Sequence, residues 1–385
     1  MNNTYKVNDS KMSKDFSKNT FSDFNKNEVI KLFENNLVLS KLHDSCYSAI
    51  ELHVSLQNDK ILETVLYIAS LYTNIDYPKL PNVLFELYTK YESCMKQYNG
   101  KNLPDNRNNQ EIRNIISYIT SIVCLSPKNN YFQLGLLSKI NDYEFDINII
   151  KKNIKTTDLE LTKDIFFEDE SKELVIALNE IAYLLKTSND TTKDILYWIS
   201  WIIELEKRKR KEKSVLFIHI RKITNISEKL TQLWEWILWN IFLKEAHFRN
   251  IPELYQQIYS LYNFYKFNFK KSSRTKYLIY IYHVIYLFKK KIDWDVLPLT
   301  DKYHLILQSN LSNNEFYKIT FEKTGKKYYI DTPIDEKQIK PSVSKTQSSK
   351  GDKTKKPKKP KKLKKKEIKE IKDENQTKRM SYLFE

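Results

Sequence analysis

The sequence contains only four glycines, Gly100, Gly135, Gly325 and Gly351. Loops that cradle phosphates need several glycines close together, because the backbone must approach the phosphate without an intervening Cβ. No two of these glycines fall within one loop. The sequence therefore excludes Walker, dinucleotide-binding and nucleophile-elbow motifs, and no other catalytic signature stands out.

Cysteine is sparse as well, with Cys46, Cys94 and Cys124 far apart in the chain. An odd, widely spaced set argues against a disulfide framework and favours a reducing compartment. Residues 1–27 lack an apolar run of signal-peptide length. The longest uncharged apolar run covers the twelve residues 277–288, short of the roughly 18 that span a bilayer. We therefore expect an intracellular protein without a transmembrane segment.

Apolar residues recur at helical spacing over most of the 385 residues, and the aromatic share of 13% supplies ample bulk for a core. We predict an all-α fold, a multi-helix bundle or array in two parts. The expected parts are a disordered leader over 1–25, a helical domain over 26–157, a tryptophan-rich helical domain over 168–310, an irregular or β-hairpin segment over 311–334, and a disordered Lys-rich tail over 335–385.

Helix boundaries follow from caps and breakers. Pro81 suits the first turn of a helix, and Glu168-Asp169-Glu170 places negative charge at the start of another. Trp198 and Trp201, like Trp236 and Trp239, are three residues apart and share a face. We expect these rings in the core between packed helices; a partner interface is the alternative. The expected helices cover about 27–42, 45–56, 59–72, 81–98, 110–125, 170–186, 190–211, 227–248, 252–269 and 273–291.

Most of the net positive charge lies in residues 341–385. Residues 341–385 hold 16 Lys+Arg and 6 Asp+Glu, a net +10 of the chain's +17. They have too few apolar residues to bury a core, and their prolines keep the lysines extended. We predict non-specific contact with nucleic-acid phosphates or an anionic membrane surface; a nuclear-import signal and a solubilising tail are the alternatives. The lysines assigned to this contact are Lys355, Lys356, Lys358, Lys359, Lys361, Lys362, Lys364, Lys365 and Lys366.

A second basic cluster lies at the turn between the last two expected helices, interleaved with aromatic residues. Such a mixture can bind single strands by phosphate contact and base stacking. A solvated turn above an aromatic core is the interpretation we favour. The run 207–213 at another helix end is interpreted as a solvated helix end, with a second phosphate site as the alternative. The cluster consists of Lys266, Lys270, Lys271, Arg274 and Lys276.

Residues that could hold a metal do not converge. His43 and Cys46 share a helical face with His53 ten residues on, but zinc needs four ligands and no fourth is evident. The carboxylates of 142–146 and 293–295 could hold Mg²⁺, although turn and cap roles suffice for them. We therefore expect no catalytic residue, no metal and no cofactor.

The segments Tyr197–Glu204 and Leu233–Trp239, with Ala49–His53 and Pro78–Pro81 upstream, carry apolar patterns around a Lys/Arg run. In these patterns the chain resembles helical proteins of unassigned role in large cytoplasmic DNA viruses. The resemblance implies a virion or factory-associated protein, located in the host cytoplasm or the virion. Nuclear localisation is a further option, because the Lys-rich tail could act as an import signal.

These patterns together predict a non-enzymatic, nucleic-acid-associated scaffold. The helical body would bind protein partners, and the tail would contact phosphates without sequence preference. The alternative is a structural or assembly protein whose tail binds packaged genome or an anionic membrane. An enzyme built on loop carboxylates is the third interpretation.

Overall fold

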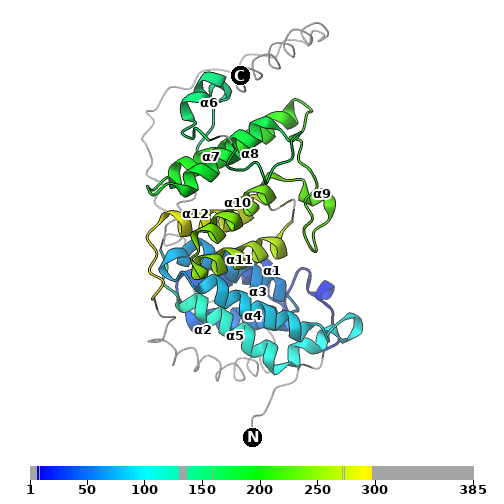
Figure 1. Cartoon of the computed structure of the whole chain (residues 1–385). Helices are drawn as coiled ribbons and strands as arrows, with labels where there is room; N and C mark the ends of the chain where they lie inside the picture. Colours follow the sequence, from blue (N-terminus) through cyan, green and yellow to red (C-terminus); the bar gives the residue numbers. More distant parts are fainter. Residues whose placement is uncertain are drawn as a thin grey trace, which may run out of the picture. The chain divides into compact units, whose positions relative to one another are not determined.

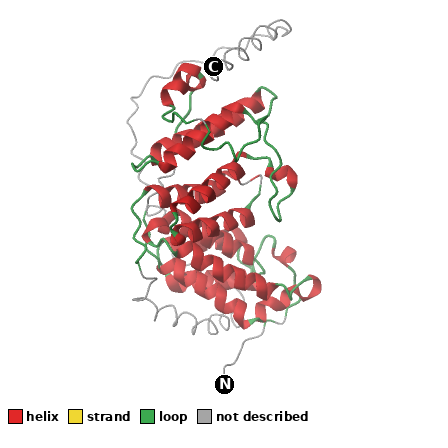
Figure 2. Cartoon of the chain, in the orientation of Figure 1, coloured by secondary structure: helices red, strands yellow, loops and turns green. Residues whose placement is uncertain are grey.

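The protein is all-α. A computed structural model describes residues 7, 9–129, 137–158, 160–270, 272 and 274–296. Within these ranges every regular element is a helix, and the one β-type contact is an isolated bridge between Asn19 and Asn25 (Figure 2). The predicted hairpin segment 311–334 and the Lys-rich tail 335–385 lie outside the described residues.

The first group of helices begins where the sequence offers caps. The Asn25 side chain accepts hydrogen bonds from the first turn of α1, Pro81 lies in the first turn of α4, and Asn109 caps α5. These helices are α1 (Lys26–Val38), α2 (Leu42–Val54), α3 (Asn58–Ile68), α4 (Leu80–Met95) and α5 (Gln110–Leu125), with a π-helical turn at Ala69–Thr73 and a 3₁₀ helix, η4, at Gly100–Asn108.

The apolar stripes of this group meet in one core. α2 packs against both α1 and α5, and α4 packs against α5 (Figure 1). Phe33, Leu52, Val65 and Ile112, one from each of α1, α2, α3 and α5, are fully buried. Burial of side chains of this size contributes about 1.5–3 kcal/mol each, which is what holds these short helices together.

The second group comprises α7 (Lys172–Lys186), α8 (Thr192–Lys211), α9 (Glu228–Thr231), α10 (Trp234–Arg249), α11 (Pro252–Asn268) and α12 (Arg274–Lys289). The helix expected over 227–248 is broken, because Leu233 has extended backbone angles between α9 and α10. The Trp236 indole N–H donates to the Leu230 carbonyl at 2.7 Å across this break. A side chain thus satisfies a carbonyl that a continuous helix would have used.

All five tryptophans of these helices are in the core, as expected. Trp198 and Trp201 contact each other on α8, with ring centroids 5.7 Å apart. Trp236 and Trp239 instead pack on Tyr265 of α11, at 5.1 and 5.5 Å. The two pairs therefore fill different layers of the helix stack rather than meeting at a common centre.

The two groups of helices lie in one compact unit that spans Met1–Ser138 and Thr157–Ile334. α4 packs along α11, and α12 packs on the π-helical turn and on α3 (Figure 1). Lys139–Thr156, which contains α6 (Ile147–Asn153), belongs to a second unit. The domain boundaries expected from the sequence remain predictions.

The structure differs from the predicted disordered leader over residues 9–25. Phe16 is buried, and the buried Arg107 guanidinium lies 5.4 Å from its ring centroid. Arg107 also donates to the backbone carbonyls of Asp9 and Lys11, at 3.1 and 2.6 Å. A polar segment is thus fixed by an arginine that lies about a hundred residues away in the sequence.

No helix within the described ranges is both long and apolar enough to cross a bilayer.

Candidate functional site

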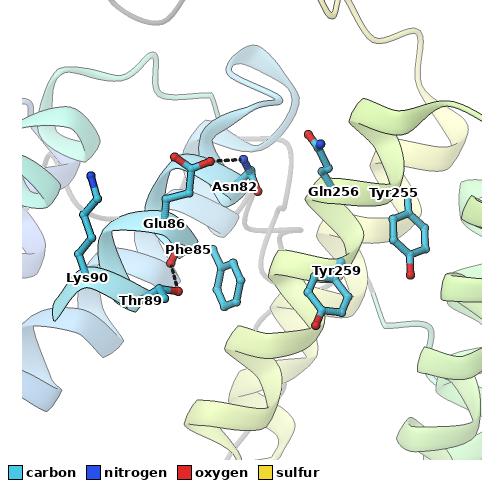
Figure 3. Close-up of a pocket in the computed structure, with 8 residues that line it drawn as sticks. All are labelled: Asn82, Phe85, Glu86, Thr89, Lys90, Tyr255, Gln256 and Tyr259. Carbon is cyan, nitrogen blue, oxygen red and sulfur yellow. Dashed lines mark hydrogen bonds between the residues drawn. The ribbon is translucent and has the colours of Figure 1, made fainter. Parts of the chain in front are cut away.

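A groove of about 530 Å³ lies between α4 and α11, open to the surface and lined mainly by apolar atoms (Figure 3). Concave apolar sites with a few polar groups are where proteins most often bind ligands or partner side chains. The lining residues are Asn82, Phe85, Glu86, Thr89 and Lys90 of α4 and Tyr255, Gln256 and Tyr259 of α11.

α11 lines the groove because it carries two apolar stripes. Leu254, Ile258 and Leu261 form the stripe that is buried in the core. Tyr255 and Tyr259, four residues apart, form a second stripe and stay 38% and 44% exposed. A helix that needs only one apolar face to fold therefore presents another to the outside.

The rings in the groove are ordered against one another. Tyr255 and Tyr259 lie nearly parallel, with centroids 6.3 Å apart and an interplanar angle of 13°. Phe85 meets Tyr259 edge-on at 6.2 Å and the buried Phe264 at 5.8 Å. The groove wall is thus continuous with the core, which limits how far it can deform.

Hydrogen bonds hold the two helices at the end of the groove. The Asn82 backbone N–H donates to Gln257 Oε1 of α11 at 2.9 Å, and the Ser260 hydroxyl donates to Asn82 Oδ1 at 3.3 Å. The Asn82 amide group donates to Glu86 Oε1 at 3.0 Å (Figure 3). With Glu86 and Lys90 in the lining, the charges of the groove cancel, so it suits an apolar segment better than a phosphate.

One member of the predicted basic cluster, Arg274, is turned inward. Arg274, at the start of α12, donates from Nε and Nη2 to Glu235 Oε1 of α10, at 2.6 and 2.5 Å. Its Nη1 donates to Glu206 Oε1 of α8 at 2.7 Å. Arg210 approaches the same Glu206 oxygen at 3.2 Å. One guanidinium therefore links three helices, and we call this contact the Arg274 bridge.

Glu235 is the most perturbed member of the Arg274 bridge. Burial raises the pKa of this carboxyl to about 7, although the positive charge of Arg274 acts in the opposite direction. Its second oxygen, Oε2, is buried without a hydrogen-bond partner in the described part of the chain. The Tyr265 hydroxyl is also buried without a hydrogen-bond partner in the described part of the chain. Its pKa is raised, mainly by burial and secondly by the negative charge of Glu235.

The other members of the cluster take different roles. Lys276 donates to Glu63 Oε1 of α3 at 2.9 Å and lies 4.9 Å above the Tyr67 ring. Lys266 lies 5.1 Å above the ring of Tyr262. Lys270 is exposed at the turn. Lys271 and the nine lysines predicted between Lys355 and Lys366 lie outside the described residues.

The carboxylates and histidines considered as metal ligands have local structural partners. Asp146 caps α6, and Asp293 accepts from the backbone N–H of Asp295 at 3.0 Å. Glu144 accepts from the backbone N–H of Asn141 at 2.9 Å. The His53 Nδ1 lies 2.8 Å from Asn58 Oδ1 in the core. Within the described ranges no group of His, Cys, Asp and Glu side chains could hold a metal ion.

The sequence interpretation missed the tyrosine groove and the three acids that meet the basic cluster. A signal for the groove was present, since Tyr255 and Tyr259 add a second stripe to a helix whose core stripe is already complete. The acids gave no such signal, because Glu63 is 213 residues from Lys276 and Glu235 is 39 residues from Arg274.

Comparison with known proteins found no matching family model, no matching curated protein and no matching solved structure. The resemblance to helical proteins of large DNA viruses stays a prediction.

Proposed function

We propose that this chain is a non-enzymatic, nucleic-acid-associated scaffold. Its Lys-rich segment contacts phosphates, and its helical body binds protein partners. The observation that carries the proposal is the distribution of charge. The segment 341–385 has ten more basic than acidic residues, while two cations of the second basic cluster, Arg274 and Lys276, are held by carboxylates.

This distribution favours the Lys-rich segment for phosphate contact on energetic grounds. A cation that already has a carboxylate partner must lose that pair before it can meet a phosphate. Arg274 would leave Glu235 buried and uncompensated. Among the described cations of the cluster, Lys266 and Lys270 are therefore the ones that could add to binding.

The groove between α4 and α11 supports the second half of the proposal. Exposed tyrosines over a firm apolar base are typical of the anchoring centre of protein interfaces. The cancelled charges of Glu86 and Lys90 fit an apolar partner segment, for which long-range electrostatic attraction is unimportant.

The cysteines without a disulfide support localisation of the protein in a reducing compartment. Nucleic acid is also found in such compartments. Cys46 and Cys124 are buried and unbridged, and burial raises the pKa of Cys46 to about 12. A thiol with such a pKa is a structural apolar group, not a nucleophile.

The phosphate contact is tested by binding labelled DNA and RNA to the full chain over a salt series. The comparison variants are a chain truncated before Pro341 and a full chain with Lys266→Ala and Lys270→Ala. We expect truncation to remove most of the affinity and to flatten the salt dependence, whose slope is about −0.9 per duplex phosphate contacted. Equal affinity of the full and truncated chains would contradict the proposal.

The partner role of the groove is tested by co-purification of the native protein with and without Tyr255→Asp and Tyr259→Asp. The matched control is Tyr143→Asp, which changes a tyrosine that is 64% exposed at a site outside the groove. We expect a partner that the control variant retains and the groove variant loses. A partner retained equally by both would assign the interface to another surface.

A further inference from the structure

The segment between α8 and α9 is hydrogen-bonded like one edge of a β-strand. The Phe217 N–H donates to Ser171 Oγ at 2.8 Å, and the Phe217 carbonyl accepts from the Ser171 N–H at 3.1 Å. Two residues on, the His219 N–H donates to Glu170 Oε1 at 2.8 Å. Bonding at every second residue is the pattern of an extended chain that is paired along one side.

The pattern continues at Arg221, whose N–H approaches Thr231 Oγ1 at 3.3 Å. The Arg221 side chain then fixes the segment, because Nη1 and Nη2 donate to the two oxygens of the buried Glu170 at 2.5 and 2.8 Å. A bidentate pair of this kind is geometrically specific. The inner side of the segment is therefore held firmly against the start of α7.

The N–H groups of the alternate residues Leu216, Ile218 and Ile220 belong to the opposite side; Ile220 is exposed, Leu216 is half-buried and Ile218 is buried. Within the described chain nothing accepts from the N–H groups of these three residues. The Ile218 carbonyl accepts at 3.2 Å from the side chain of Gln232, which is exposed and could give way to a peptide N–H. We call these three residues the free edge. Unpaired edges are templates for another extended chain.

The Ile218 side chain is buried and anchors the segment, whereas several other apolar side chains around the free edge are exposed. Val215, Phe217 and Ile220 are 81%, 45% and 47% exposed, and Phe167 beside them is 50% exposed. Phe167 lies 4.6 Å from His219, whose ring is also 5.0 Å from Phe217. Phe167 and Phe217 therefore form one exposed aromatic patch around His219, and exposed apolar patches often mark interaction sites.

Positive charge flanks this surface on both sides. Lys211, Glu212 and Lys213 precede the segment with a net charge of +1, and Lys222 follows it; all four are exposed. None of the three lysines pairs with a carboxylate within the described chain, in contrast to Lys207 and Lys209. An occupant with acidic residues at both ends would match this arrangement.

We propose that the free edge binds an extended peptide segment of a partner protein by strand addition. The peptide carries apolar side chains at alternate positions and acidic residues on either side. Backbone hydrogen bonds supply the affinity in this mode, and side-chain contacts at alternate residues supply the specificity. The inference rests on the partner-binding half of the proposed function, but it uses a surface separate from the groove and the Lys-rich segment.

The test uses the full chain and a synthetic peptide of alternating Val and Thr with two Glu at each end. The first control peptide has the same sequence with every second backbone nitrogen methylated, which removes the donors along one side. The second has Lys in place of Glu. We expect binding of the Glu peptide, measured by fluorescence anisotropy, and at least about tenfold weaker binding of both controls. Equal binding of the methylated peptide, or no binding of the Glu peptide, would overturn the proposal.

Two variants at one position separate backbone from side chain. Ile220→Pro removes an N–H that has no partner within the described chain and places a ring on the free edge. Ile220→Thr removes the apolar side chain but keeps the N–H. We expect Ile220→Pro to abolish peptide binding, and Ile220→Thr to weaken it by less than about fivefold. A circular dichroism spectrum unchanged in Ile220→Pro shows that the helices remain. Equal loss in both variants would contradict strand addition.

A second copy of this chain is the competing occupant. Light scattering during size-exclusion chromatography should give the same mass for the native chain and for Ile220→Pro. A dimer that Ile220→Pro dissociates would overturn the assignment to a partner peptide. Because the groove variant and the truncation before Pro341 leave the free edge intact, failure here is distinguishable from failure of the proposed function.

Discussion

Two basic clusters with similar sequences have opposite surroundings in this protein. At the turn between α11 and α12, Arg274 and Lys276 point toward Glu206, Glu235 and Glu63 on other helices. At the end of α8, Lys207, Lys209 and Arg210 of the run 207–213 have carboxylate partners, whereas Lys211 and Lys213, on either side of Glu212, are exposed. The first cluster connects α12 with three other helices, whereas the second connects α8 with α7 through Lys209 and Glu173 and leaves Lys211 and Lys213 at the surface.

The difference shows that a local count of cations does not give the charge of a surface. What matters is whether helices from elsewhere in the chain bring carboxylates within reach. Around Arg274 the surroundings exclude water, so removing one partner of an ion pair leaves the other buried and is costly. Around Lys211 the charge is hydrated and screened, and its contribution to stability is small.

The largest expected effect follows from breaking the Arg274 bridge. Arg274→Met keeps the apolar stem but leaves Glu235 buried without its cation. We expect a loss of about 3–5 kcal/mol in the free energy of unfolding, measured by urea denaturation. The matched control, Lys211→Met, should change it by less than about 0.5 kcal/mol. Similar values for both variants would remove the distinction between the two clusters.

The next effect is the pH dependence that Glu235 creates. Its pKa is about 7 in the folded protein and 4.5 without perturbation, so between these values the folded state holds a proton that the unfolded state has lost. This contribution to stability is complete below pH 4.5 and is lost as pH rises to about 7.

The variant Glu235→Gln removes this proton equilibrium. The free energy of unfolding of the native chain, relative to Glu235→Gln, should fall by about 2 kcal/mol between pH 5 and pH 7. The measurement is urea unfolding of both proteins at the two pH values. A relative stability that rises over this range would mean that Arg274 outweighs burial at this carboxyl.

A smaller effect is expected at Lys276. Its pair with Glu63 is partly exposed, and its ammonium group lies above the Tyr67 ring. Lys276→Met should cost about 0.5–1 kcal/mol of unfolding free energy at low salt, and less at high salt. Denaturation at two salt concentrations checks this. Salt independence would assign the loss to packing of the side-chain stem.

The smallest effect on stability belongs to the exposed lysines. Lys211→Ala with Lys213→Ala should leave the free energy of unfolding within about 0.5 kcal/mol of the native value. The same double variant should weaken binding of the Glu-flanked peptide at low salt, because both charges flank the free edge. Unchanged peptide affinity would show that these lysines do not contribute to that surface.

Helix positions were largely predictable, because their signals are local. Pro252 and Asn109 mark helix starts, and the structure begins α11 and α5 there. The break at Leu233 was missed, because the apolar pattern continues through it and does not show the hydrogen bond from the Trp236 indole N–H to the Leu230 carbonyl across the break. The order of residues 9–25 was missed for a similar reason, since it depends on the distant Arg107.

The candidate sites were predictable only in part. The basic residues were identified, but their partners were not, because an ion pair such as Lys276–Glu63 leaves no pattern in the sequence. The open side of the segment at Ile218 was hidden too, since an apolar run does not show which backbone groups are already bonded. Tyr255 and Tyr259 were the one overlooked signal with a local cause.

The sequence by itself determined that this chain is helical, that the five tryptophans of its expected helices are buried, and that most of its net positive charge lies in the segment 341–385. Each of these depends on composition or on spacing within one helix. Only the tertiary structure decided that Arg274 is neutralised while Lys211 is not, and that α11 leaves two tyrosines uncovered. These outcomes depend on which helices become neighbours, and chain segments far apart in sequence meet through the packing of the whole core.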